Sequence, residues 1–265
     1  MVLVGVDIGG TKIAFAKIVR GVAKNKQVFP TPSSYSQLLA LLQEQLALFK
    51  PSKVGLSVPG FTDKKGTIIF AGSLLSFLVG KSLIKDVSSF LSCPVKQCND
   101  ADAFALAEHD KGRTLGIIWG SGIGSGFVVD DKLFSSQVEL GHMPLRDGTL
   151  ESSCGGRFVE YNYALWFKKE HSLPEIYQET KVNKHVALFF DQVLEDLASG
   201  IATAILLLNP DTVVLGGGAS NLPVLRELKS KLRKKLPQEF SLPTIRRHSR
   251  GADAGLFGCV KLFSV

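Results

Sequence analysis

The stretch Asp7-Ile8-Gly9-Gly10-Thr11-Lys12 decides the fold class. A β-branched apolar run, residues 2–6, precedes it and an alternating apolar run, Ile13 to Val19, follows it, which predicts a β-hairpin around a glycine turn. Glycines lack a Cβ, so backbone N–H groups can approach a phosphate; Thr11 adds a hydroxyl donor, and Asp7 can hold Mg²⁺ through its water shell. An ordinary hairpin needs only the glycines, so the Asp, Thr and Lys around them favour a phosphate-binding turn.

A second strand, glycine turn and strand occur further along the chain. Leu115 to Trp119 leads into Gly120-Ser121-Gly122-Ile123-Gly124-Ser125-Gly126, and Phe127 to Val129 is again apolar. The turn is not a P-loop, because no Gly-Lys-Ser or Gly-Lys-Thr follows, and it does not open a helix as a dinucleotide-binding turn would. We therefore interpret Gly120 to Gly126 as a second phosphate loop in an α/β fold made of two similar halves.

Composition narrows the class of protein. The 265 residues are 45% hydrophobic and carry a net charge of +7, with Lys and Arg spread along the chain. The densest basic cluster, Lys229 to Lys235, lies among leucines at helical spacing, which favours a solvated helix face over a nucleic-acid site. The apolar run Ile201 to Leu208 is shorter than the roughly 20 residues of a membrane span. Without a basic region before an apolar signal core, the sequence predicts a cytoplasmic protein.

Two polar side chains, Asn99 and Asp100, stand before a predicted short helix, Ala101 to Glu108. The corner between a strand and a helix is where α/β sheets usually hold ligands. A carboxylate there could accept the proton of an attacking hydroxyl. Asp100 could equally be the N-cap of the helix, and from the residues alone the cap is favoured.

Two further stretches contain groups suited to small-molecule binding. Glu139-Leu-Gly-His142, with Glu160 beyond it, offers carboxylate and imidazole groups of the kind that recognise sugar hydroxyls, although each alone is more often an ordinary surface residue. Val213-Val-Leu-Gly216-Gly217-Gly218 is a strand that ends in glycines. There a flat base or a ribose could lie against the backbone, or the glycines could be a plain loop.

Taken together, six motifs resemble those of the ROK family of sugar kinases and repressors: Asp7-x-Gly-Gly-Thr-Lys12, Val58-Pro-Gly60, Asn99-Asp-Ala101, Gly120-Ser-Gly-Ile-Gly124, Glu139-x-Gly-His142 and Leu215-Gly-Gly-Gly218. The resemblance implies an actin-like ATPase (ribonuclease H-like) fold, with two similar α/β domains and a cleft between them. The first domain would comprise residues 1–110 and 251–265, and the second residues 111–250.

The resemblance also assigns roles. It makes Asp100 the general base that activates a sugar hydroxyl, usually the one on C6, and Asp7 an indirect Mg²⁺ ligand. The sugar would be held by Asn99, Gly60, Glu139, His142 and Glu160. The phosphates of ATP would be bound by Gly9, Gly10, Thr11, Lys12, Gly120, Ser121, Gly122 and Gly124, and adenosine by Gly216, Gly217 and Gly218.

The sequence departs from the family pattern in two places that bear on function. The family's zinc motif has a histidine and three cysteines, whereas the matching stretch here, residues 152–160, has only Cys154; we expect no zinc, because a structural site takes four N or S ligands. Ser73-Leu74 stands where a family asparagine contacts the sugar. The helix-turn-helix of the repressors is missing, so we do not expect DNA binding.

These observations predict an ATP-dependent hexokinase, and glucokinase is the leading hypothesis. The alternatives are a kinase for N-acetylmannosamine, N-acetylglucosamine, mannose or fructose, a polyphosphate-using kinase, or a non-catalytic sugar sensor of the same fold. A homodimer is left open.

Overall fold

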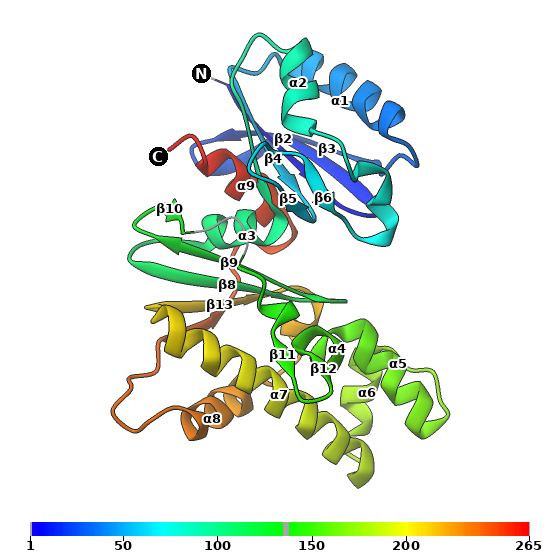
Figure 1. Cartoon of the computed structure of the whole chain (residues 1–265), viewed down its shortest axis with the longest axis vertical. Helices are drawn as coiled ribbons and strands as arrows, with labels where there is room; N and C mark the ends of the chain where they lie inside the picture. The colour runs from blue at the N-terminus through cyan, green and yellow to red at the C-terminus, as the bar shows by residue number, and fades with distance from the viewer. Residues whose placement is uncertain (1, 135–137, 265) are drawn as a thin grey trace. The chain divides into compact units, whose positions relative to one another are not determined.

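The structure, a computed structural model, describes residues 2–134 and 138–264. It forms two compact units (Figure 1). Unit 1 comprises Met1–His109, Asp131–Gln137 and Arg250–Val265; unit 2 comprises Asp110–Asp130 and Val138–Ser249. The chain thus completes most of unit 1, forms unit 2, and returns to unit 1.

Unit 1 is built on a five-stranded sheet in the order β3-β2-β1-β4-β7. Its strands are β1 (Leu3–Ile8), β2 (Lys12–Val19), β3 (Val22–Pro30), β4 (Lys53–Val58) and β7 (Val95–Asn99). The first three are antiparallel, and β1, β4 and β7 run parallel. A small hairpin and a 3₁₀ segment follow β4: β5 (Phe61–Thr62), β6 (Ile68–Phe70) and η1 (Ser73–Leu78). Segment 131–137 adds the short strand β10 (Lys132–Leu133), which contacts α3.

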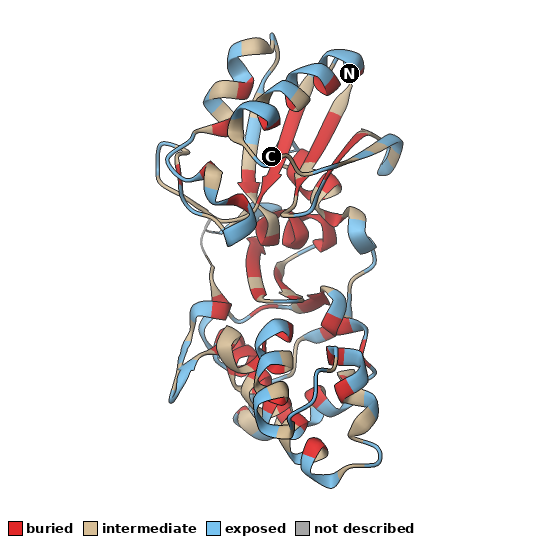
Figure 2. Cartoon of the chain, turned by 90° about the vertical axis from the view of Figure 1, so that its right-hand side faces the viewer, coloured by how far each residue is buried: buried red, intermediate tan, exposed pale blue. Residues whose placement is uncertain are grey.

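Helices cover both faces of this sheet. They are α1 (Tyr35–Phe49) and α2 (Leu83–Phe90) on one face, and α3 (Asp100–Glu108) and α9 (Ala254–Lys261) on the other. Val4, Val6 and Ile8 of β1 are buried toward α1, so the alternate residues, among them Asp7, face α9. Figure 2 shows these strands largely buried beneath more exposed helices.

Helix α9 lies unusually close to its neighbours because glycines line the contacts. A Cβ on Gly5 would come within 2.3 Å of the Leu256 carbonyl oxygen, and one on Gly55 within 2.4 Å of that of Cys259. A Cβ on Gly258 would overlap the Ala103 carbonyl oxygen of α3 at 1.6 Å. Only glycine permits this approach, which brings α9 directly over Asp7.

Unit 2 repeats the central strand pattern of unit 1. Its strands β8 (Arg113–Trp119), β9 (Ile123–Val129), β13 (Thr212–Gly216) and β14 (Thr244–Arg247) lie in the order β9-β8-β13-β14. β9 and β8 are antiparallel, and β8, β13 and β14 are parallel. The same directions occur in unit 1, where β2 is antiparallel to β1 and the strands β1, β4 and β7 are parallel. The predicted fold of two similar α/β halves is confirmed at this level.

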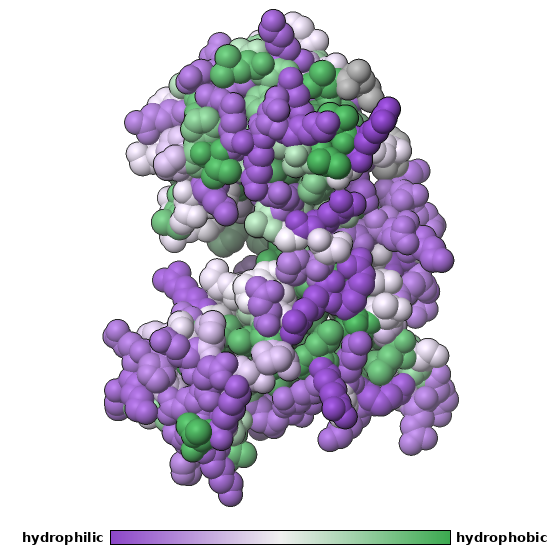
Figure 3. Space-filling model, turned by 180° about the vertical axis from the view of Figure 1, so that it is seen from behind, coloured by the Kyte–Doolittle hydropathy of each residue, from purple (hydrophilic) through white to green (hydrophobic). Residues whose placement is uncertain are grey.

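The remaining elements of unit 2 are helical or short. They are η2 (Leu140–His142), the hairpin β11 (Pro144–Leu145) and β12 (Gly148–Thr149), α4 (Leu150–Cys154), α5 (Gly156–Phe167), α6 (Leu173–Glu179), α7 (Lys184–Leu208), η3 (Gly218–Asn221) and α8 (Leu225–Lys235); η4 (Gly251–Asp253) opens the return to unit 1. On the face of the molecule shown in Figure 3, hydrophilic residues are spread widely rather than gathered at one place.

In the part of the chain that the structure describes, no helix is long and apolar enough to cross a membrane. Of the helices described, the longest is α7, which carries charged residues in its first half and packs one face into the core of unit 2.

A carboxylate network ties α5, α6 and α7 together. Glu179 accepts hydrogen bonds from the Tyr163 hydroxyl (2.5 Å) and the Asn183 amide (3.0 Å), which lower its pKa from 4.5 to about 2. A lowered pKa in the folded state contributes stability that is complete above about pH 4.5 and is lost as the pH falls toward 2. We expect Glu179→Gln to lower the unfolding temperature at neutral pH. We also expect the unfolding temperature of this variant to fall less steeply than that of the wild type as the pH is lowered.

The measurement is the thermal unfolding midpoint as a function of pH. Glu170→Gln, which changes a neighbouring carboxylate outside this network, serves as the control. If the unfolding midpoints of the wild type and Glu179→Gln fell equally with decreasing pH, Glu179 would not have this stabilising role.

Candidate active site

Asp7 is the residue before the last of β1, on the side of the sheet that α9 covers. Its Oδ1 accepts a hydrogen bond from the Ser57 hydroxyl of β4 at 2.7 Å. Burial raises the pKa of Asp7 to about 6; the nearby Asp100 raises it further, while Ser57 and Lys12 oppose the rise. A half-buried carboxylate next to a second carboxylate is stabilised as an anion by a divalent cation, so these residues fit Mg²⁺ carried by a nucleotide.

The glycine turn after Asp7 has a defined shape. The Gly9 N–H donates to the Lys12 carbonyl at 2.9 Å, and the Thr31 hydroxyl donates to the Gly9 carbonyl at 2.7 Å. Leu74, whose side chain is 64% exposed, lies against the turn: its Cδ1 would be 3.1 Å from a Cβ on Gly10. The position where the family has an asparagine is therefore at the rim of this turn, in η1.

The two polar residues at the corner between β7 and α3 have different structural roles. Asn99, not Asp100, is the N-cap of α3: its Oδ1 accepts from the Ala101 N–H at 2.7 Å. Its Nδ2 donates to the Gly60 carbonyl at 2.9 Å, which joins the corner to the glycine after β4. The expectation that Asp100 caps the helix is corrected, because the preceding asparagine already satisfies the exposed amide.

Asp100 is left available for chemistry. It is the first residue of α3, and its Oδ1 lies 3.0 Å from the same Ala101 N–H. Burial raises the pKa of Asp100 above the ordinary value, opposed by the hydrogen bonds from the Ala101 backbone and Asn99. A desolvated carboxylate with a raised pKa is a better proton acceptor than a solvated one.

The second glycine turn is shorter than the sequence suggested. Gly124 and Gly126 belong to β9, where they pair with Ile118 and Gly116 of β8, so the turn itself is limited to residues 120–122. The alternating glycines resemble a loop in sequence, but Ile123 and Ser125, which stand between them, are buried in the sheet.

Three segments of unit 2 meet at this turn. The amides of Gly156 and Arg157 donate to the carbonyls of Gly120 (2.8 Å) and Ser121 (3.0 Å), so the start of α5 is bonded to it. A Cβ on Gly217, whose φ is +81°, would lie 2.4 Å from the Trp119 carbonyl oxygen. The structure thus brings the glycines predicted for phosphate and for adenosine next to one another within unit 2.

Glu139 and His142 are also held beside this turn, at the two ends of η2. The Ser125 hydroxyl donates to the Val138 carbonyl (2.6 Å) and accepts from the Leu140 N–H (2.8 Å), which fixes η2 to β9. A Cβ on Gly141 would lie 2.2 Å from the Ile123 carbonyl oxygen, so this glycine lets η2 pack on the strand.

A second carboxylate beside this turn is one that sequence reasoning missed. Glu151, in the first turn of α4, accepts the Ile123 N–H at 2.8 Å, and its carboxylate lies against Gly122. Glu160 instead sits within α5, where its Oε1 accepts the Leu173 N–H at 2.8 Å and holds the loop before α6. The structure brings Glu151 to the turn beside η2.

We therefore predict that Glu151→Gln weakens sugar binding and that Glu160→Gln leaves it nearly unchanged. A hydrogen bond to a charged group contributes about 1.5–3 kcal/mol, so the KM for the sugar should rise roughly tenfold to a hundredfold in Glu151→Gln. Steady-state kinetics of the two variants measure this directly. The opposite pattern would restore Glu160 as the sugar ligand.

The residues around Cys154 do not fit a zinc ion. The Cys154 thiol is buried and donates to the Val193 carbonyl at 3.3 Å, and its own carbonyl accepts from the Trp119 indole at 2.7 Å. Within residues 2–134 and 138–264, no group of three or more His, Cys, Asp or Glu side chains is placed to hold a metal. A capping box between Thr149 and Ser152 secures the start of α4 instead.

Comparisons with known proteins identify the family of the chain. The model of the ROK family matches residues 3–265. The N-acetyl-D-glucosamine kinases of Vibrio atlanticus and Aliivibrio fischeri are each 32% identical to the chain, and each alignment covers 97% of the chain and 98% of the relative.

Solved structures of ROK proteins have the same fold as this chain. The ROK hexokinase of Thermus thermophilus superimposes with a TM-score of 0.89 at 27% identity, covering 98% of this chain and 97% of that one. A ROK family glucokinase of Streptomyces griseus, in complex with glucose and AMPPNP, has the same fold, with a TM-score of 0.79 at 22% identity over 99% of each chain. The predicted actin-like ATPase fold is confirmed, and the chain is a sugar kinase that belongs to the ROK family.

Proposed function

We propose that this kinase transfers the γ-phosphate of ATP to the 6-hydroxyl of a hexose, with N-acetyl-D-glucosamine as the preferred acceptor and D-glucose second. The observation that carries the chemistry is the corner at Asn99 and Asp100. Asn99 is the N-cap of α3 and binds Gly60, so the cap does not depend on the Asp100 carboxylate, whose pKa is raised by burial.

Each unit contributes separate groups to this reaction. In unit 1, Asp100 accepts the proton of the sugar hydroxyl, Asn99 and Gly60 hold the sugar, and the turn from Gly9 to Lys12 binds the transferred phosphate. Mg²⁺ bound to ATP neutralises phosphate charge, and Asp7 orients it through water.

In unit 2, Glu139, His142 and Glu151 bind the remaining sugar hydroxyls. The turn at Gly120 to Gly122 and the glycines Gly216 to Gly218 accept the nucleotide. Backbone N–H groups and glycines suit this task because no side chain prevents the close approach of phosphate or ribose.

The choice of acceptor rests on the relatives. The sequence alone favoured D-glucose, whereas the curated relatives quoted above are N-acetyl-D-glucosamine kinases at 32% identity and the Thermus structure is a hexokinase at 27%. N-acetyl-D-glucosamine therefore comes first and D-glucose second.

A coupled ADP-release assay tests the proposal. The panel contains D-glucose, N-acetyl-D-glucosamine, N-acetyl-D-mannosamine, D-mannose and D-fructose, each with MgATP. We expect the highest kcat/KM for N-acetyl-D-glucosamine, with the product phosphorylated on C6 as read by NMR. A higher kcat/KM for D-glucose would make D-glucose the preferred acceptor. The absence of turnover with every hexose would refute the proposed reaction.

A donor screen with polyphosphate in place of ATP completes the test. The chain's net charge of +7 would suit a polyanionic donor. We expect turnover with ATP alone, because the basic residues are spread along the chain rather than gathered in one block. Turnover with polyphosphate that falls as salt rises would contradict this expectation.

A further inference from the structure

Three parallel strands of unit 2 end at the same edge of its sheet. β8 leads into the turn at Gly120, β13 ends at the first of the glycines Gly216 to Gly218, and β14 ends at Arg247, which pairs with Leu215. The His248 N–H donates to the Leu215 carbonyl at 2.9 Å, so the end of β14 stays beside the end of β13. Ligands of α/β sheets lie at the carboxyl ends of such strands, and the first two ends carry glycines proposed to bind the nucleotide. The end of β14 is therefore placed to act on the same site.

The segment after β13 is packed tightly against the turn at Gly120. A Cβ on Gly217 would lie 2.9 Å from the Gly120 nitrogen, so the two backbones are in direct contact. The Ser220 hydroxyl of η3 donates back to the Gly217 carbonyl at 2.7 Å, and Ser220 is buried. Gly217 and η3 are thus held together, and a displacement of η3 displaces the glycines.

Arg247 fixes the far end of η3. Its Nη2 donates to the carbonyl of Leu222, the residue that follows η3. The last carbonyls of a helix lack partners inside the helix, and arginine side chains can supply them. β14 is the outermost strand of its sheet and Arg247 is exposed, so burial does not explain why this long side chain is held in one place. The contact holds η3 between the edge of the sheet and the turn at Gly120.

We propose that Arg247 is a positioning residue for the nucleotide donor: by holding Leu222 it fixes η3, and through η3 it fixes Gly216 to Gly218, against which adenosine lies. The inference rests on the nucleotide role proposed above for these glycines. Adenosine contacts are the same before and during phosphate transfer, so they set the affinity for the donor and leave kcat unaffected. A residue that only stabilised the fold would change the amount of active enzyme and neither KM.

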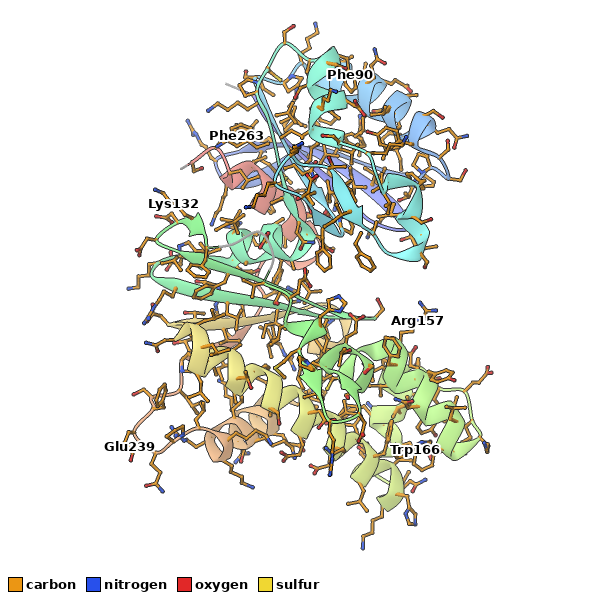
Figure 4. The ribbon with its side chains drawn as sticks, viewed as in Figure 1. Phe90, Lys132, Arg157, Trp166, Glu239 and Phe263 are labelled. Carbon is orange, nitrogen blue, oxygen red and sulfur yellow. The ribbon has the colours of Figure 1, made fainter. Side chains whose placement is uncertain are left out.

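Arg233 gives a matched comparison in the same unit. Its guanidinium also donates to backbone carbonyls of the loop after α8, those of Leu236, Pro237 and Phe240. Figure 4 shows Glu239 of this loop at the opposite side of unit 2 from Arg157, whose amide is bonded to the phosphate turn. Arg233→Met therefore removes an arginine of the same kind without removing a contact to η3.

Steady-state kinetics of the full chain with MgATP and the preferred hexose test the proposal. In Arg247→Met we expect the KM for MgATP to rise about threefold to thirtyfold, with kcat and the KM for the sugar unchanged. Arg247→Lys keeps a donor for the Leu222 carbonyl, so its KM for MgATP should lie between those of Arg247→Met and the wild type. Arg233→Met should keep all three constants. Circular dichroism confirms that each variant is folded.

Adenosine separates positioning from a direct effect of the positive charge on the phosphates. Because adenosine is uncharged, its inhibition constant against MgATP should rise in Arg247→Met by about the same factor as the KM for MgATP. A loss limited to MgATP, an equal rise of this KM in Arg233→Met, or a wild-type KM in Arg247→Met would each overturn the proposal. Calorimetry tells this failure from that of the proposed function. If the wild type bound neither MgATP nor adenosine, both would fail, whereas binding that Arg247→Met leaves unchanged would overturn the positioning role alone.

Discussion

Replacing Asp100 with Asn is expected to lower kcat by a factor of about 10²–10⁴ while the sugar still binds. The amide keeps the size of the side chain, and the α3 cap is untouched because Asn99 provides it. What the variant loses is the proton acceptor, which acts only when the sugar hydroxyl attacks the phosphate. An interaction made only in the transition state lowers kcat rather than affinity.

Stopped-flow or steady-state kinetics give kcat, and calorimetry gives the affinity for the sugar. Asp110→Asn, which changes an exposed carboxylate shortly after α3, is the control and should behave as the wild type. Undiminished turnover in Asp100→Asn would refute the role of Asp100. A parallel loss of sugar affinity would mean that this residue binds the sugar instead.

The second large effect is expected from Gly255→Ala. A Cβ at this position would lie 2.3 Å from the carboxyl carbon of Asp7, so either α9 or Asp7 has to move. Overpacking of this kind costs about 1–3 kcal/mol of stability. Because the displaced group is the carboxylate proposed to position Mg²⁺, we also expect a clear rise in the KM for MgATP.

Gly72→Ala provides the comparison. A Cβ on Gly72 meets no atom within 4 Å, and its φ of −58° suits alanine. Unfolding curves and MgATP titrations of both variants separate the two effects. If Gly255→Ala unfolds like the wild type and keeps its KM for MgATP, α9 does not hold Asp7 in place.

The sequence predicted those parts of the fold in which local pattern and tertiary environment agree. The stretch Ala101 to Glu108 was predicted as a short helix, and α3 spans Asp100–Glu108. The same holds for the hairpin at Asp7. Helix α9 was not anticipated, since Gly255 and Gly258 lower helix propensity, and only the close packing against β1, β4 and α3 explains their presence.

The site was predicted unevenly for a similar reason. Asp100 and the glycine turns stand in motifs that sequence alone reveals. Glu151 was not predicted because it precedes residues 152–160, the stretch that matches the family's zinc motif, in which the carboxylate is Glu160. The signal that could have found it is the pair Thr149 and Ser152, whose capping box marks the start of α4 and places Glu151 in its first turn.

The position of α9 in the chain has a consequence for biosynthesis. This helix belongs to unit 1, yet the ribosome makes it only after the whole of unit 2. Until then the face of the sheet that carries Asp7 lacks its cover, and Gly5 and Gly55 face water instead of the backbone of α9. The nascent chain can therefore complete unit 2 early, but it completes unit 1 only when synthesis has passed Lys261.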